Sequence, residues 1–92
     1  MVRRSRLERY FDILKVIENG FVKPTPIMYK TNLAWVPLQE MLETLIKNGF
    51  IQEEKKGTAR IYNITDKGRS ALAYHLKALG GFTKDEEISS AR

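Results

Sequence analysis

Apolar residues recur at helical spacing in the first twenty positions of the chain. Leu7, Tyr10, Phe11, Leu14 and Ile17 lie three or four residues apart, which is the period of one helix face. Ser5-Arg6-Leu7-Glu8 has the Ser-x-x-Glu form of a capping box, which marks a helix start. Asn19-Gly20 supplies a C-terminal stop. The pattern predicts a helix over residues 6–19.

Two further helices are predicted before residue 50. In "KPTPIMYKTN", Thr25 is the expected N-cap and Pro26 the first helical residue, so a short helix should cover residues 26–31. Thr31-Asn32 then forms a turn. The next apolar face consists of Leu38, Met41, Leu42, Leu45 and Ile46. Pro37 must lie in the first turn of this third helix, and Asn48-Gly49 should end it.

Alternation replaces helical periodicity after residue 50. "FIQEEKK" and "ARIYNIT" are expected to pair as a hairpin, with Gly57 in the turn. Tyr62 and Ile64 point to one face and Ile61 to the other, so helices should cover at least one face. Thr65 is the expected cap of a fourth helix, with Asp66 favourable at its N-terminus. Gly80-Gly81 should stop this helix near Leu79.

These elements predict an α+β, mainly α fold: a winged helix-turn-helix with three helices, a two-stranded wing and a C-terminal helix. The chain has 92 residues, enough for one core. We expect a winged-helix domain over residues 1–79, which includes a basic N-terminal arm, and a flexible polar tail over residues 80–92.

The segments "PIMYKTNLAW", "LIKNGFI" and "YNITDKG" carry a family resemblance. Across about residues 5–79 the chain resembles small archaeal winged-helix DNA-binding proteins, and the last two segments are also similar to PadR-like and MarR-like regulators. The resemblance implies a protein that docks its third helix on duplex DNA and is often dimeric.

Charge is consistent with a polyanionic partner. The chain has a formal net charge of +5, with an isoelectric point near 9.6. Residues 1–20 and residues 50–69 each carry five basic and three acidic residues. A basic excess gathered in two segments favours nucleic acid as the partner. Simple solubility remains an alternative explanation.

Three groups of residues are candidate DNA contacts. Lys55, Lys56, Thr58 and Arg60 on the wing could grip phosphates or enter the minor groove, or be a solvated turn. Arg3, Arg4 and Arg6 could form an arm along the DNA backbone, or a frayed terminus.

The turn and the start of the third helix, the end commonly used for base reading, supply donors from Lys30, Thr31, Asn32 and Gln39. Asn32 could instead serve only its own turn. Trp35 is expected to pack rather than to stack on a base.

The outward face of the third helix is predicted to hold Glu40, Glu43, Thr44 and Lys47. Carboxylates facing phosphates are unfavourable unless one accepts a hydrogen bond from a cytosine amino group. This acidic face favours a second hypothesis, in which the winged helix is a protein-protein interaction module of a transcription complex.

The last helix is predicted to be apolar on two sides. Leu72, Leu76 and Leu79 form the stripe expected to face the core, while Ala71, Tyr74 and Ala78 lie on a separate side. Small residues around an aromatic suit a close contact between helices, so we expect a homodimer through Ala71, Tyr74 and Ala78. The alternative is that the alanines serve helix propensity alone.

Other classes of function find little support in the sequence. There is no cysteine, and His75 is the only histidine, so zinc sites and nucleophile–base pairs are disfavoured. We expect no enzyme activity, metal, cofactor or small-molecule ligand. No segment has the run of roughly 18 apolar residues that a membrane span needs. The sequence predicts a cytoplasmic, duplex-DNA-binding protein, with transcription regulation as its function.

Overall fold

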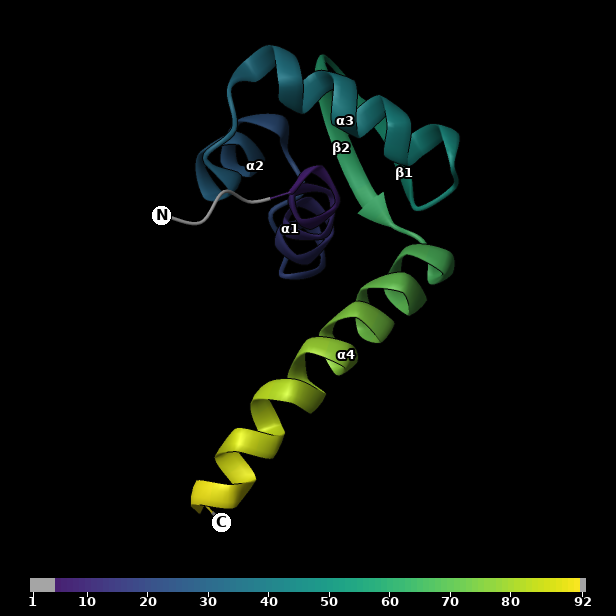
Figure 1. The fold of residues 1–92 in the computed structure, drawn as a ribbon. Coiled ribbons are helices and arrows are strands. Elements are labelled where there is room, and N and C mark those ends of the chain that lie inside the picture. The colour runs from purple at the N-terminus through teal and green to yellow at the C-terminus, as the bar shows by residue number, and fades with distance from the viewer. Residues whose placement is uncertain (1–4, 92) are drawn as a thin grey trace.

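The computed structural model describes the backbone of residues 5–91 and the side chains of residues 5–78. It contains three helices, a two-stranded antiparallel sheet and a long last helix, in that order (Figure 1). This is the predicted winged helix-turn-helix, and the prediction of fold class is confirmed.

The first helix, α1, spans Arg6–Glu18 and begins with the predicted capping box. The Glu8 backbone N–H donates to the Ser5 hydroxyl over 3.1 Å, and the Ser5 N–H donates to the Glu8 carboxylate over 3.2 Å. These two bonds pair N–H groups that a helix start leaves without partners. One turn of sequence therefore defines where the helix begins.

The second helix, α2, spans Pro24–Thr31, so it begins two residues before the predicted start. The predicted cap at Thr25 is wrong: Lys23 occupies the N-cap position and makes no side-chain hydrogen bond. Both prolines fit the first turn because backbone N–H groups there need no helical partner. The helix ends at Asn32, whose φ of 60° is left-handed.

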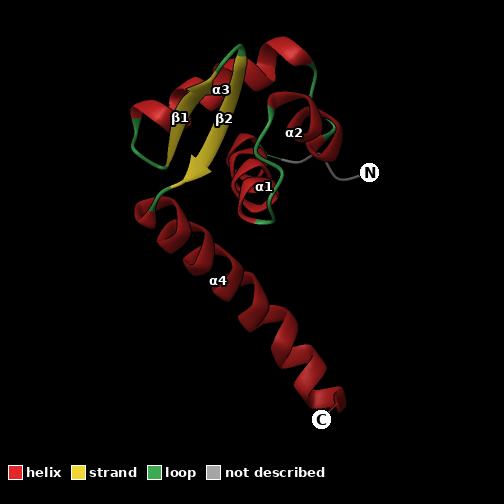
Figure 2. Cartoon of the chain, turned by 180° about the vertical axis from the view of Figure 1, so that it is seen from behind, coloured by secondary structure: helices red, strands yellow, loops and turns green. Residues whose placement is uncertain are grey.

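The third helix, α3, spans Trp35–Lys47, and Pro37 lies in its first turn as predicted. Strands β1 (Ile51–Lys56) and β2 (Ala59–Ile64) form the expected hairpin, with Ile51 opposite Ile64 and Lys55 opposite Arg60. Gly57 adopts a φ of 64° in the turn. The hairpin turn lies beside the start of α3 in both ribbon views (Figures 1 and 2).

The last helix, α4, spans Asp66–Ala91. The predicted cap is confirmed, since the Gly68 N–H donates to the Thr65 hydroxyl over 3.0 Å. The predicted stop at Gly80–Gly81 is wrong, because the helix continues through both glycines. Glycine costs about 1 kcal/mol relative to alanine in a helix, which weakens a helix without ending it. Whether residues 80–92 move independently of residues 1–79 stays a prediction.

Apolar side chains from every element meet in one core. Its largest fully buried member is Tyr62, which is 1% exposed. The other buried members are Ile13, Leu14, Ile17, Ile27, Leu33, Leu38, Met41, Leu42, Leu45, Ile51 and Leu72. Backbone bonding ties β2 to the helical part as well, since the Tyr62 N–H donates to the Val22 carbonyl over 2.8 Å. The wing is therefore fixed to the helices rather than free.

The long α4 makes the molecule elongated. The radius of gyration is 14.7 Å and the extents are 51 × 31 × 20 Å, whereas a compact chain of this length would have a radius of gyration of about 12 Å. Only the beginning of α4 lies against the rest of the domain, and the remainder projects away from the wing (Figure 1). No helix among residues 5–91 combines the length and apolar character needed to cross a membrane.

A corner of hydrogen bonds joins the end of α3 to the start of α4. The Thr65 hydroxyl donates to the Gly49 carbonyl over 2.7 Å, and the Lys67 ammonium donates to the Asn48 carbonyl over 2.7 Å. A Cβ atom on Gly68 would collide with the Phe50 carbonyl oxygen. The segments "NGF" and "TDKG" therefore meet at this corner and fix the direction in which α4 leaves.

Candidate nucleic-acid interface

Two exposed lysines lie at the tip of the hairpin. Lys55 and Lys56 end β1, and Thr58 lies in the turn; all three are exposed. Because the turn lies beside the start of α3 (Figure 2), these lysines and the first turn of α3 occupy the same end of the molecule. A duplex that met α3 with this end would bring phosphates toward the lysines.

Arg60 differs from these lysines because it is already engaged. Its Nε lies 3.3 Å from a Glu53 carboxylate oxygen. A side-chain hydrogen bond with Tyr62, followed by the charges of Glu53 and, more weakly, Glu43, raises the pKa of Arg60 above its usual value. The guanidinium therefore stays charged and is partly neutralised within the protein. A phosphate contact by Arg60 stays a prediction, and its pairing with Glu53 and Tyr62 makes that contact less favourable.

The residues of the predicted turn are presented unequally. Lys30 is exposed, with its ammonium 4.7 Å from the centre of the Phe21 ring. The Thr31 hydroxyl donates to the Ile27 carbonyl over 2.7 Å and is part-buried, so it is already satisfied within α2. Asn32 is exposed and in the left-handed conformation that ends α2. Asn32 therefore does serve its turn, while its side chain remains accessible.

Gln39 is half-buried, and its amide nitrogen is buried without a hydrogen-bond partner among the described residues. A buried unpaired donor costs about 1–3 kcal/mol. Gln39 must therefore change its side-chain conformation to donate a hydrogen bond to a base edge, and base reading by Gln39 stays a prediction.

Only part of the predicted N-terminal arm is visible. Arg6 is exposed at the start of α1, with its guanidinium carbon 5.7 Å from the centre of the Tyr10 ring. Arg3 and Arg4 lie outside the described residues. The arm as a DNA contact stays a prediction.

The outward face of α3 is acidic at its middle and apolar at its start. Glu40, Glu43 and Lys47 are exposed, as predicted. Thr44 is instead half-buried in the wall of a pocket, so its predicted outward position is wrong. The expectation that Trp35 packs is also wrong, because Trp35 is 47% exposed, and its neighbour Val36 is 64% exposed. Sequence reading missed this apolar surface because it assigns bulky side chains to the core.

The α4 face toward the core differs from the predicted stripe. Leu72 is buried as expected, but Leu76 is 41% exposed, and the side chain of Leu79 lies outside those described. Ala71 is half-buried and lines a pocket against α1, so it does not lie on a separate free side. Tyr74, which is 79% exposed, and Ala78 do lie on an exposed side.

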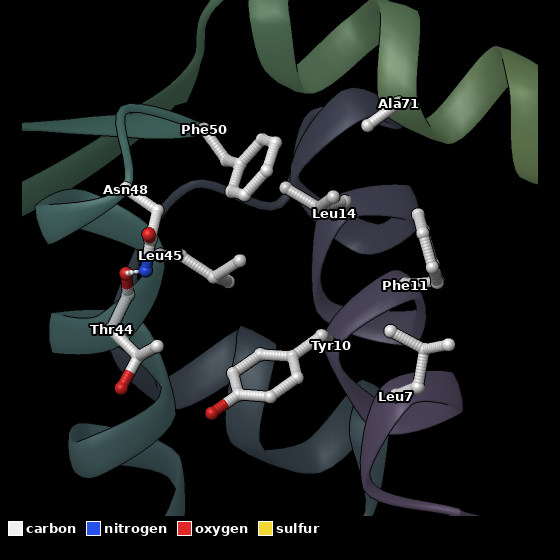
Figure 3. A pocket seen from close by; sticks show the side chains of 9 residues that line it. All are labelled: Leu7, Tyr10, Phe11, Leu14, Thr44, Leu45, Asn48, Phe50 and Ala71. Atoms are coloured by element: carbon white, nitrogen blue, oxygen red, sulfur yellow. Dashed lines mark hydrogen bonds between the residues drawn. The ribbon is translucent and has the colours of Figure 1, made fainter.

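One pocket of about 300 Å³ opens between α1, α3 and the start of α4 (Figure 3). Its lining is mainly apolar: Leu7, Tyr10, Phe11, Leu14, Thr44, Leu45, Asn48, Phe50 and Ala71. The Asn48 side-chain amide donates to the Thr44 carbonyl over 2.8 Å, which occupies part of the polar lining. No acidic or basic side chain lines this pocket. Among the described residues, no cluster of His, Cys, Asp or Glu is arranged to hold a metal ion.

Comparison with protein families and curated proteins gives two matches of interest. The family described as winged helix-turn-helix matches residues 3–79. The chain is also 35% identical over 71 residues to the uncharacterized protein MJ0290 of Methanocaldococcus jannaschii. That alignment covers 77% of this chain and 32% of the relative, so the chain spans about a third of the relative's length.

Solved structures give the same fold. Sso10a-2, a DNA-binding protein from Sulfolobus solfataricus, has a TM-score of 0.68 and 27% identity, and the alignment covers 95% of this chain and 94% of that one. The transcriptional regulator BldR from the same organism has a TM-score of 0.75 and 17% identity, covering 88% of this chain and 60% of that one. At 17% identity, the second likeness concerns the fold alone.

Proposed function

The chain belongs to the winged helix-turn-helix family, and we propose that it is a duplex-DNA-binding protein that regulates transcription. Electrostatic attraction brings the lysines of the wing and the arginines of the N-terminal arm onto the phosphate backbone. The α2–α3 turn and the first turn of α3 then meet base edges in the major groove.

The observation that carries this proposal is the position of the wing. Lys55 and Lys56 are exposed on a hairpin turn that lies beside the N-terminal end of α3 (Figure 1). Phosphate contacts fix the register of a protein on DNA, while base contacts give specificity. Placing both at one end of the molecule lets a single duplex be gripped and read together. The near full-length likeness to Sso10a-2, described as a DNA-binding protein, supports the same function.

We further propose a homodimer through α4. Tyr74 and Ala78 are exposed, on a helix whose 26 residues extend about 39 Å. A two-fold contact is self-complementary, so Tyr74 and Ala78 would meet the same surface on the partner. Ala71 belongs to this contact less directly, because it already packs toward α1. Such a dimer would present two α3 helices to one duplex.

The proposal does not include catalysis. The pocket between α1, α3 and α4 offers neither a charged side chain nor a nucleophile paired with a base. We propose that the protein is not an enzyme and needs no cofactor. Because its proposed partner is chromosomal DNA, we propose that it acts in the cytoplasm.

The test is equilibrium binding to duplex DNA over a range of salt concentrations. Binding through phosphates should weaken linearly when the logarithm of the association constant is plotted against the logarithm of salt concentration, with a slope of about −0.9 per phosphate contact. If the protein does not bind duplex DNA at low salt, the proposal is rejected.

A second candidate function rests on the exposed carboxylates of α3. Glu40 and Glu43 are unfavourable neighbours of phosphate but suit a basic protein surface. Glu40→Gln together with Glu43→Gln should strengthen non-specific DNA binding if α3 enters a groove. Loss of a stable protein complex in the same double variant, with no DNA binding by the wild type, would favour the interaction module instead.

A further inference from the structure

The first turn of α3 presents apolar side chains at the end of the helix proposed to meet DNA. Ala34, Trp35, Val36 and Pro37 are all exposed. The nearest polar candidate on the helix, Gln39, has its amide nitrogen buried. The start of this helix therefore offers few hydrogen-bonding groups for direct base readout.

Val36 is the most exposed of the large apolar side chains on this helix, at 64%. At 100° per residue, it lies on the same side of α3 as Glu40 and Glu43, opposite the buried face of Leu38 and Leu45. Packing does not explain a valine there, and neither does helix propensity, because valine is a weaker helix former than alanine. The side chain is placed to touch whatever approaches the outward face.

In the major groove, apolar contact has one distinctive target. Guanine, adenine and cytosine present hydrogen-bonding groups there, while thymine adds a C5-methyl group. An isopropyl group against a polar edge displaces water without replacing its hydrogen bonds, which is unfavourable. The same group against a methyl group buries apolar surface on both sides.

We propose that Val36 is a specificity-determining residue that selects thymine by contact with its C5-methyl group. The inference rests on the proposed function, since it requires α3 to enter the major groove of a duplex. It adds a preference that the charges of the wing cannot supply, because phosphate contacts carry no sequence information.

The test compares two duplexes that differ only in this methyl group. One is an alternating A·T duplex, and the other carries deoxyuridine in place of every thymidine. Each docked α3 should favour the thymidine duplex about four-fold, which at 1.4 kcal/mol per ten-fold is about 0.8 kcal/mol, the free energy of burying one methyl-sized group. A dimer with both α3 helices docked should therefore prefer it about sixteen-fold. Contacts of the wing with phosphates should be nearly the same on both duplexes and so cancel in the ratio.

Variants then assign the effect to Val36. In Val36→Ala the ratio should fall to about one. Val36→Thr keeps the branched shape and one methyl group, so its ratio should be intermediate. Leu7→Ala removes another exposed aliphatic side chain, on α1 and outside the helix-turn-helix, and should keep the wild-type ratio. Circular dichroism confirms that each variant is folded.

The outcomes distinguish failure of the thymine contact from failure of the proposed DNA binding. Equal wild-type affinity for both duplexes would overturn the thymine proposal while leaving DNA binding intact. A wild-type ratio that survives in both Val36 variants would assign the methyl contact to another side chain and overturn the role of Val36. Failure to bind either duplex at low salt would instead reject the proposed function.

Discussion

The rings of Phe11 and His75 stack in parallel, with their centroids 3.9 Å apart and their planes 3° apart. Phe11 belongs to α1 and His75 to α4, and both side chains are half-buried. The contact therefore attaches the beginning of α4 to the three-helix part of the domain. His75, the only histidine of the chain, contributes here by packing its ring against Phe11.

Phe11→Ala should lower the free energy of unfolding by about 2 kcal/mol. This is less than the roughly 3–5 kcal/mol lost on truncating a fully buried phenylalanine, because Phe11 is half-buried, and it includes the loss of ring stacking. Urea unfolding measures the change. Lys77→Ala, an exposed substitution on α4, should stay within about 0.5 kcal/mol of wild type. A similarly small change for Phe11→Ala would mean that the stacking does not hold α4.

Asn32 can be tested for turn formation and base reading separately. Asn32→Gly keeps the left-handed conformation at φ 60° without strain, whereas Asn32→Ala should cost about 1 kcal/mol or more of stability. Both variants remove the side-chain amide. If Asn32 reads a base, both should relax preference at one base pair by roughly 1–3 kcal/mol. Wild-type selectivity in Asn32→Gly, measured on a set of single-base variants, would leave Asn32 with its turn alone.

Substitutions of the wing cations should differ in their effect on DNA binding, because Lys55 and Lys56 are exposed while Arg60 is paired with Glu53. Lys55→Ala and Lys56→Ala should each reduce the magnitude of the salt slope by about 0.9 per bound chain and lower affinity equally on all sequences. Arg60→Ala should change the slope less, because Glu53 already pairs with the guanidinium. Binding titrations at several salt concentrations measure the slopes, with Lys77→Ala as a control. An Arg60 effect equal to that of the lysines would show that the pair opens on DNA.

Tyr74→Glu should convert the proposed dimer into a monomer. The charge enters an exposed position, so the variant should remain folded by circular dichroism while sedimenting as a single chain. DNA binding should weaken strongly, because two linked half-site contacts reinforce one another. Half-sites for the wild type should be spaced by roughly 34–36 Å or a multiple. A wild type that sediments as a monomer at high micromolar concentration contradicts the dimer.

Local signals predicted much of the fold. The capping box at Ser5, the turn at Gly57 and the cap at Thr65 each depend on residues within one turn, so the sequence identifies them directly. The start of α2 was misplaced because both Pro24 and Pro26 tolerate the first helical turn. The end of α4 was misplaced because a helix can continue through glycine at a modest energetic cost.

For the candidate site, the sequence predicted the positions of charged residues but not their contacts. Exposed lysines on a hairpin turn follow from composition and turn chemistry. The pairing of Arg60 with Glu53, the satisfied hydroxyl of Thr31 and the buried amide of Gln39 depend on neighbours brought together by folding or on side-chain conformation. The exposure of Val36 was missed because periodicity ranks apolar residues by face but does not say which of them remains outside a small core.

The corner at Gly68 sets the direction in which α4 leaves the wing. The Gly68 backbone packs closely against the Phe50 carbonyl, and Thr65 and Lys67 bond to the Gly49 and Asn48 carbonyls, so the start of α4 is tied to the end of α3. Two chains joined along α4 would then hold their wings at a separation determined by these two corners. A larger residue at position 68 should force the backbone of this corner apart and, where the domain still folds, change the spacing of the half-sites although it lies outside the proposed DNA and dimer contacts.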